Sequence, residues 1–160
     1  AEICRDLQDR LVMIARVSDA GAFVNTNALT LKRSHGDYSV MQLLYDGSEI
    51  KAVLDFVNAG EVPIAWELIR SYSYMDCTFN AARLAAYTNE YRRYAEVSMD
   101  DLRYMPYLYL GQLLSSTYGY KQYLQTGDEE LLAFGRWRTE MCRYLIANAG
   151  EVSAELVRLA

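Results

Sequence analysis

Apolar residues recur at helical spacing near the start of the chain. The positions are Ile3, Leu7, Leu11, Ile14 and Ala15. This spacing places apolar side chains on one face of an amphipathic helix, and glycine commonly follows a helix end. We therefore predict a first helix that ends at Gly21. The next segment, 22–32, shows no sustained period, so we expect a loop there.

The pattern changes character between residues 43 and 54. Two short apolar-rich runs, 43–45 and 50–54, are separated by Asp46-Gly47-Ser48. A turn signal between two such runs is typical of a β-hairpin. We predict one hairpin here and no other strands.

The chain after Pro63 is expected to be helical throughout. Pro63 suits the first turn of a helix because its missing N–H has no partner there. Ser98 is a candidate N-cap, and the two acids that follow Met99 suit the positive end of a helix. Pro106 then either kinks that helix or begins a new one. An intervening helical segment carries Phe79, Leu84, Tyr87, Tyr91 and Tyr94.

Two further breaks divide the last third of the chain. Thr126-Gly127-Asp128 follows an apolar stretch, and Gly150 stands where a helix commonly ends. We predict a helix over 128–149 and a short terminal helix from Glu151. With no repeat, low-complexity tract or linker, residues 1–160 are expected to form a single domain, mainly α with a small β-hairpin.

Composition and charge exclude several classes of function. The chain has 160 residues, of which 52% are hydrophobic, which suits one domain with a substantial core. Its formal charge of −5 argues against a nucleic-acid partner, because such proteins usually carry a basic surface. No apolar run is long enough to span a bilayer, and the first residues do not resemble a signal peptide. We expect no nucleic-acid or membrane partner.

Cysteine and histidine usage limits the possible metal sites. Cys4, Cys77 and Cys142 are far apart and odd in number, so neither a disulfide framework nor a zinc site is indicated. A reducing cytoplasm is the expected compartment. Because the chain has one histidine, a multi-histidine site is excluded, and any metal must be a hard cation held by oxygen atoms.

Two acidic residues flank the predicted hairpin. His35-Gly36-Asp37 precedes it and Leu54-Asp55-Phe56 follows it. Magnesium-dependent phosphoryl transfer needs two converging carboxylates, one beside the attacking hydroxyl and one on the metal. These two motifs therefore suggest such a site.

Residues 31–74 resemble the C-terminal lobe of the aminoglycoside phosphotransferase and choline kinase superfamily, which has a protein-kinase-like fold. That lobe usually reads HGDxxxxN, then a hairpin, then IDF or IDW. The corresponding residues are His35, Gly36, Asp37, Gln42, Leu54, Asp55 and Phe56. Val62-Pro63 and Glu67-Leu68 resemble a modified DP…DL segment of the same lobe. The local sequence is most similar to the homoserine kinase type II-like branch.

The resemblance implies a role for each motif residue. Asp37 would orient the acceptor hydroxyl and take its proton, although a turn aspartate is the alternative. Asp55 would bind Mg²⁺, although it could instead be a solvated residue at a strand end. His35 is expected to support the catalytic loop structurally rather than to donate a proton. Glu67, in place of the usual aspartate, would support the same loop.

Gln42 departs most from the family pattern. The asparagine expected there offers an amide oxygen to the metal, and glutamine carries the same group on a side chain one methylene longer. Because Mg²⁺ demands close octahedral geometry, both weakened metal binding and its loss remain open.

The sequence before His35 predicts one helix and one loop, and no Gly-rich phosphate loop occurs in the chain. We therefore expect the N-terminal nucleotide-binding lobe to be absent and the chain to be inactive by itself. A truncated piece, a natural remnant and a scaffold are the three explanations. The resemblance implies the C-lobe of an ATP- and Mg²⁺-dependent kinase acting on a small-molecule hydroxyl. The alternative is an inactive helical binding or scaffold module.

Two expectations concern partners. The acceptor would be an amino acid, amino alcohol, sugar or aminoglycoside; some of the fourteen tyrosines could line its pocket, although core packing is the simpler role for them. Apolar groups near Val40, Met41 and Phe56 would be exposed if a lobe were missing, which suggests self-association.

Overall fold

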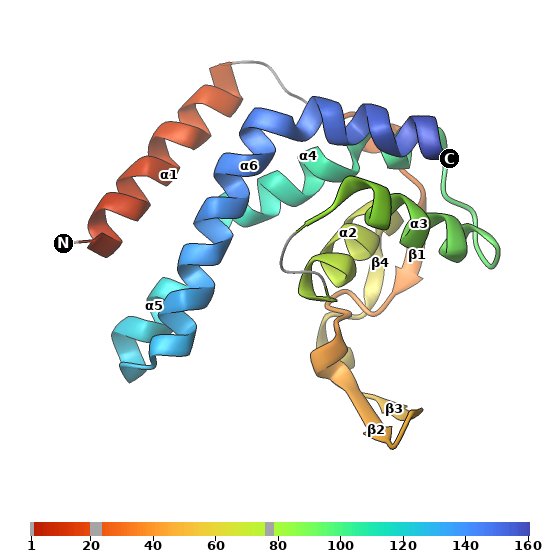
Figure 1. Ribbon diagram of the computed structural model, residues 1–160, viewed down its shortest axis with the longest axis horizontal. Helices are drawn as coiled ribbons and strands as arrows, with labels where there is room; N and C mark the ends of the chain where they lie inside the picture. The colour runs from red at the N-terminus through yellow and green to blue at the C-terminus, as the bar shows by residue number, and fades with distance from the viewer. Residues whose placement is uncertain (1, 20–23, 76–78) are drawn as a thin grey trace. The chain divides into compact units, whose positions relative to one another are not determined.

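The computed structural model describes residues 2–19, 24–75 and 79–160, and most of them are helical (Figure 1). The helices are α1 (Glu2–Asp19), α2 (Ile64–Met75), α3 (Ala81–Arg92), α4 (Met99–Ser115), α5 (Tyr118–Thr126) and α6 (Glu129–Leu159). The strands are β1 (Leu31–Ser34), β2 (Leu43–Asp46), β3 (Glu49–Val53) and β4 (Gly60–Pro63). The predicted fold class, mainly α with a small β region, is confirmed.

The chain divides into two compact units. The first comprises Ala1–Val24 and Pro106–Ala149, and the second comprises Asn25–Met105 and Gly150–Ala160. The division crosses α4 at Pro106 and α6 at Gly150. All the residues of the two acidic motifs belong to the second unit. Whether residues 1–160 act as one domain stays a prediction.

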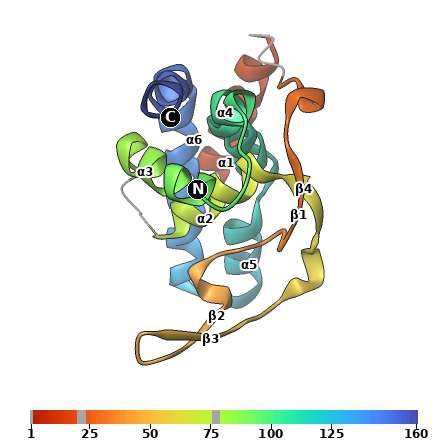
Figure 2. The same cartoon turned by 90° about the vertical axis from the view of Figure 1, so that its right-hand side faces the viewer.

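The second unit contains a strand pair that we did not predict. β1 pairs with β4 in antiparallel register, from Leu31 opposite Pro63 to Ser34 opposite Gly60 (Figure 2). The predicted loop over 22–32 is therefore wrong at its end, which lies in β1. Pro63 is also not in a helix: it ends β4, where a missing N–H is tolerated at a strand end, and α2 begins at Ile64.

The predicted hairpin is confirmed. β2 and β3 pair in antiparallel register, and Gly47 in the turn has a φ of 61°, a conformation that glycine adopts without steric cost. Large apolar side chains are exposed on this hairpin and beside it: Met41 is 79% exposed and Phe56 58%. The self-association expected from such a surface stays a prediction.

The start of α4 is fixed by reciprocal hydrogen bonds. The Ser98 hydroxyl accepts from the Asp101 N–H at 3.1 Å, and Asp101 Oδ2 accepts from the Ser98 N–H at 2.8 Å. This capping box satisfies two backbone donors and confirms Ser98 as the N-cap. The buried Asp101 also accepts the Thr30 N–H at 2.9 Å, which ties the segment before β1 to α4.

One predicted helix boundary is wrong: α6 continues through Gly150 instead of ending there. Pro106 lies inside α4, so of the two alternatives given for it, the start of a new helix is excluded. Glycine lowers helix stability by only about 1 kcal/mol, which burial of neighbouring residues can offset. In α6, Ala149, Val152 and Leu156 are all buried. By contrast, Gly127 ends α5 as predicted, with a φ of 73°. Gly21, the predicted end of α1, lies outside the described residues.

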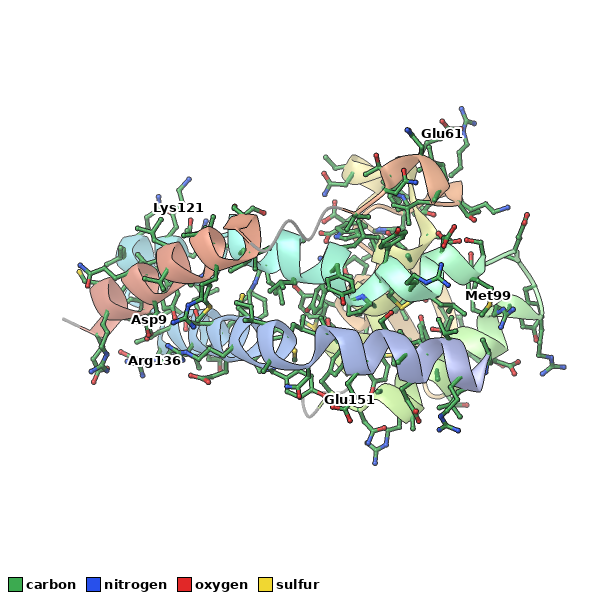
Figure 3. The ribbon with its side chains drawn as sticks, turned by 90° about the horizontal axis from the view of Figure 1, so that it is seen from above. Asp9, Glu61, Met99, Lys121, Arg136 and Glu151 are labelled. Atoms are coloured by element: carbon green, nitrogen blue, oxygen red, sulfur yellow. The ribbon has the colours of Figure 1, made fainter. Side chains whose placement is uncertain are left out.

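In the first unit, polar contacts join α1 to the other helices. Arg143 donates to Asp9, which Figure 3 labels, at 2.7 Å, and the Tyr120 hydroxyl donates to Asp6 at 2.9 Å. Arg10 is 3% exposed and donates to the carbonyl of Leu113 and, at 2.7 Å, to that of Ser116. Among the described residues, no helix is both long and apolar enough to cross a membrane.

The contacts of Arg10 predict a large stability effect. Arg10→Ala removes a buried donor that binds three carbonyls at the end of α4, so we expect the free energy of unfolding to fall by about 3 kcal/mol. Urea denaturation would measure it. Arg5→Ala, at an exposed position of the same helix, is the control and should change it by less than about 0.5 kcal/mol. Equal effects of the two variants would contradict this role of Arg10.

Candidate functional site

His35 connects the two acidic motifs. Its Nε2 lies 2.6 Å from the Leu54 carbonyl oxygen, and its ring centroid lies 4.6 Å from that of Phe56. Because a carbonyl oxygen only accepts, Nε2 carries the proton of this hydrogen bond. The imidazole is 8% exposed, so the hydrogen bond is sheltered from water. Residues 35 and 54 are thereby held together, and Asp37 and Asp55 lie on the two connected segments.

Gly36 allows the closest approach between these segments. Its φ is 77°, and a Cβ at this position would overlap the carbonyl oxygen of Asn58. Only glycine satisfies both the left-handed conformation and the close backbone contact. The loop that begins at His35 therefore lies directly on the short 3₁₀ turn Phe56–Asn58.

Asp37 pairs with Arg70 of α2. One guanidinium nitrogen of Arg70 bonds Asp37 Oδ1, and the other donates to the Tyr38 carbonyl at 3.2 Å. The Arg70 side chain is largely buried, and its guanidinium lies 5.6 Å from the ring centroid of Trp66 and 5.0 Å from that of Tyr74. Such cation–π contacts and a two-point hydrogen bond restrict both partners. The Asp37 side chain keeps 28% of its surface exposed, so solvent or a ligand can reach it.

Glu67 supports the loop from one helical turn earlier in α2. Its Oε1 accepts the Tyr38 N–H at 3.2 Å, and the carboxylate is 7% exposed. Burial raises the pKa of Glu67, while the Tyr38 N–H, the charge of His35 and the Gly36 N–H act in the opposite direction. A carboxylate on α2 thus binds the backbone on either side of Asp37.

Asp55 and Gln42 both adjoin Leu54, the residue that His35 contacts. Asp55 is exposed, makes no hydrogen bond or ion pair with the described residues, and has a left-handed backbone with φ 61°. That conformation is unfavourable for most side chains but least so for Asp and Asn. The Gln42 carbonyl accepts the Leu54 N–H at 2.8 Å, and its side-chain oxygen accepts from the Ser39 hydroxyl. Gln42 is therefore placed next to the residue that precedes Asp55.

The donor chemistry of these residues suits Mg²⁺ in part. Asp55 offers a free carboxylate, and the Gln42 amide oxygen keeps a second lone pair beside its bond from Ser39. Mg²⁺ in kinase sites commonly takes only one or two protein oxygens and fills its shell with phosphate and water. Accordingly, a cluster of three acidic, histidine or cysteine side chains is not required, and the described part of the chain contains none.

Sequence reasoning missed Arg70, Ser39 and Asn58. The sequence held a usable signal for Arg70, since Arg70 and Glu67 are the two charged residues of α2. A charge at a buried helix position usually has a partner. The roles of Ser39 and Asn58 depend on long-range and backbone contacts, for which the sequence has no local sign.

Comparison with known families identifies the family of this chain. The family model described as "Phosphotransferase enzyme family" matches residues 6–97, more than half of the chain, and the chain belongs to this family. The match includes both acidic motifs and α2. Comparisons with curated proteins and with solved structures found no match.

The Arg70 contacts predict a measurable contribution to stability. Arg70→Ala leaves Asp37 without its ion pair and the Tyr38 carbonyl without this donor, so we expect a loss of about 2 kcal/mol in urea denaturation. Arg70→Lys keeps the charge but not the two-point geometry and should lose about half as much. Arg93→Ala breaks an exposed ion pair with Glu90 and should change stability by less than about 0.5 kcal/mol. A loss for Arg93→Ala as large as that for Arg70→Ala would contradict this ranking.

The raised pKa of Glu67 predicts a pH dependence. Between the usual value of 4.5 and the raised value, the folded chain holds a proton on Glu67 that the unfolded chain has released. The stability of the wild type should therefore fall, relative to Glu67→Gln, as pH rises from about 4 through the folded-state pKa, and then level off. Denaturation of both forms at several pH values measures this difference. A difference that stays constant from pH 4 to 8 would contradict it.

Proposed function

We propose that this chain forms the catalytic lobe of an ATP- and Mg²⁺-dependent phosphotransferase that phosphorylates a hydroxyl of a small molecule. The observation that carries the proposal is the hydrogen bond from His35 to the Leu54 carbonyl, because it joins the segments that hold Asp37 and Asp55. Phosphoryl transfer needs one carboxylate at the acceptor and another at the metal. The family match supports the same class of reaction.

Asp37 would serve as the base. Arg70 binds one of its oxygens, which fixes the carboxylate and leaves the second oxygen for the acceptor hydroxyl. That oxygen would orient the hydroxyl and take its proton as the new oxygen–phosphorus bond forms. The Tyr38 backbone, held by Glu67 and Arg70, keeps the loop from moving during this step.

Asp55 and Gln42 would hold the metal ion. The Ser39 hydroxyl orients the Gln42 side chain before any ligand arrives, and the left-handed backbone fixes the main chain at Asp55. A bound Mg²⁺ would neutralise negative charge on the nucleotide phosphates. The longer side chain of Gln42 left two outcomes open, weakened metal binding and its loss. The hydrogen bond from Ser39 favours weakened binding.

The acceptor belongs to one of four classes suggested by the family resemblance: amino acids, amino alcohols, sugars or aminoglycosides. The similarity to homoserine kinase type II-like proteins favours a hydroxylated amino acid among them. The part of the protein that covers the nucleotide is expected to be a β-rich lobe bearing a lysine.

The test is acceptor-dependent ADP formation by the full protein, with a panel drawn from the four acceptor classes. Asp37→Asn should lower kcat at least about 100-fold, because it removes the base but keeps the shape of the side chain. Asp55→Asn tolerates the left-handed backbone and should keep the fold, but it should abolish Mg²⁺-dependent nucleotide binding in calorimetry.

Asp46→Asn is the matched control. Asp46 is an exposed acid at the hairpin turn, between the two motifs in sequence. Its variant should keep wild-type activity and nucleotide binding. Full activity of Asp37→Asn, or unchanged Mg²⁺-dependent binding by Asp55→Asn, would overturn the assigned roles. Absence of both ADP formation and Mg²⁺-dependent nucleotide binding in the wild type would overturn the proposed function itself.

A further inference from the structure

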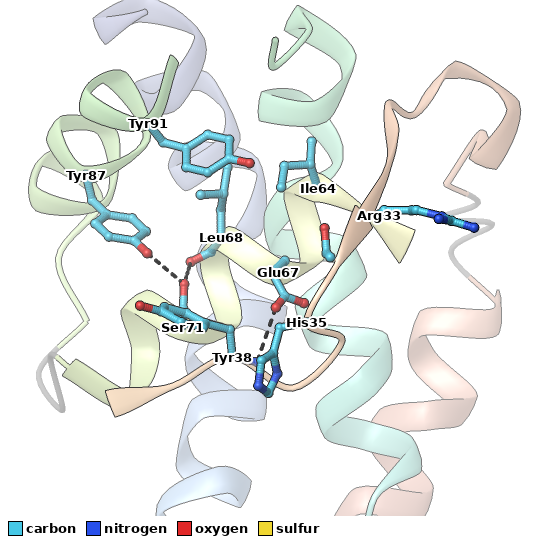
Figure 4. Close-up of a pocket in the computed structure, with 10 residues that line it drawn as sticks. Arg33, His35, Tyr38, Ile64, Glu67, Leu68, Ser71, Tyr87 and Tyr91 are labelled. Atoms are coloured by element: carbon cyan, nitrogen blue, oxygen red, sulfur yellow. Dashed lines mark hydrogen bonds between the residues drawn. The ribbon is translucent and has the colours of Figure 1, made fainter. Parts of the chain in front are cut away.

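Two consecutive residues of the loop that contains Asp37 have different surroundings. Tyr38 lines a cavity of about 340 Å³, together with residues 64, 67, 68 and 71 of α2 (Figure 4). Ser39 does not line this cavity in the described part of the chain. It is only 3% exposed, and a hydroxyl at such a depth is nearly always bonded within the protein.

The Ser39 hydroxyl has two hydrogen-bond partners. Its oxygen accepts the Met41 N–H at 3.3 Å, and its proton is donated to the side-chain oxygen of Gln42. A hydroxyl has a single proton, so Gln42 receives the only one that Ser39 can give. With the amide turned around, its NH₂ group would face Ser39 and leave this buried proton without the acceptor that it has here. The atom of Gln42 that Ser39 holds is therefore the amide oxygen.

The backbone of Gln42 is fixed at both of its polar groups. Its N–H donates to the Ser39 carbonyl at 3.1 Å, and its carbonyl accepts the Leu54 N–H at 2.8 Å. These bonds place Gln42 beside the residue that precedes Asp55, but they leave the side chain free to rotate. Among the described residues, Ser39 alone is hydrogen-bonded to that side chain. The hydroxyl thus restricts what the backbone contacts do not.

A glutamine ligand needs this restriction more than an asparagine ligand does. The glutamine side chain has one more rotatable bond, and it loses that freedom when a metal ion holds its end. A group that is already held in place binds with a smaller loss. The amide oxygen has two lone pairs, and Ser39 takes one and leaves the other for a cation. Residues behind a metal ligand commonly fix its orientation in this way.

We propose that Ser39 is a positioning residue for the metal site: its hydroxyl holds the Gln42 amide oxygen where the longer side chain can bind a divalent cation beside Asp55. This role rests on the proposed function, in which Gln42 and Asp55 bind the metal. Ser39 and Gln42 then act as one unit, so the serine matters for metal binding only while residue 42 is glutamine. An asparagine is one methylene shorter, which draws its oxygen back from Ser39.

The experiment uses Mn²⁺ as the probe, because it prefers the same oxygen ligands as Mg²⁺ and is paramagnetic. NMR of the ¹⁵N-labelled full protein, without nucleotide or acceptor, follows the broadening of amide signals as Mn²⁺ is added. We expect the amides of residues 54–56 to broaden in the wild type and to recover with excess Mg²⁺. The amides of Glu129 and Glu130, exposed acids at the start of α6, measure nonspecific binding in the same sample.

Four variants of two serines test the role of the hydroxyl. Ser39→Ala should lower the apparent Mn²⁺ affinity at Asp55 about tenfold, as loss of a residue behind a metal ligand commonly does. Ser39→Thr keeps a hydroxyl and should retain most of the affinity. Ser39→Cys keeps the shape of the side chain but is a weak donor, so it should also lose affinity, and it provides the test if Ser39→Ala does not fold. Ser48→Ala removes an exposed hydroxyl at the hairpin turn and should keep the wild-type affinity.

A second background separates positioning from a purely structural role. Ser39 also caps the 3₁₀ turn Val40–Gln42, and loss of a cap would act whichever residue stands at position 42. Gln42→Asn carries the same amide group and should keep measurable Mn²⁺ binding. In this background, Ser39→Ala should change the affinity by less than about twofold, because the two side chains are no longer coupled.

Two outcomes would overturn the positioning role and leave the metal site intact. They are an Mn²⁺ affinity that Ser39→Ala leaves unchanged, and an equal loss from Ser39→Ala in both backgrounds. A wild type whose Asp55 amide broadens no more than those of Glu129 and Glu130 would instead overturn the metal site of the proposed function, and the role of Ser39 with it. The two failures are therefore distinguishable in one set of spectra.

Discussion

The hydrogen bond between His35 Nε2 and the Leu54 carbonyl is the contact on which the candidate site depends. The two segments that it joins are separated by a hairpin whose strands are largely exposed, so the hairpin itself offers little burial to hold them. The imidazole supplies a directional bond in a sheltered place, and its packing on Phe56 excludes water. Gly36 lets the two segments approach each other closely, because only a residue without a Cβ can lie against Asn58.

Helix α2 binds the loop that contains Asp37. Glu67 and Arg70 lie one turn apart and bind the same short loop with opposite charges: the carboxylate takes the Tyr38 N–H, and the guanidinium takes the Tyr38 carbonyl and Asp37. Burying two charged groups is unfavourable unless both are well bonded. Here each charge is bonded to the backbone of the loop that contains Asp37.

The same helix borders both the loop that contains Asp37 and the cavity beside it. Residues 64, 67, 68 and 71 of α2 face the cavity, whereas 66 and 70 belong to the face that holds Asp37. Glu67 therefore belongs both to the contact with the loop and to the wall of the cavity.

Local pattern was sufficient for much of the fold, and it also located the motif residues of the candidate site. The hairpin, the capping box at Ser98, the glycine that ends α5 and the helical character after Pro63 depend on neighbours within a few residues, so the sequence by itself determined them. Tertiary structure decided the rest. The β1 and β4 strands pair across about thirty residues, α6 passes through Gly150 because Ala149 and Val152 nearby are buried, and Arg70 of α2 pairs with Asp37 of the loop. Each of these outcomes depends on burial and partners that are distant in the chain, and the local pattern contains no sign of either.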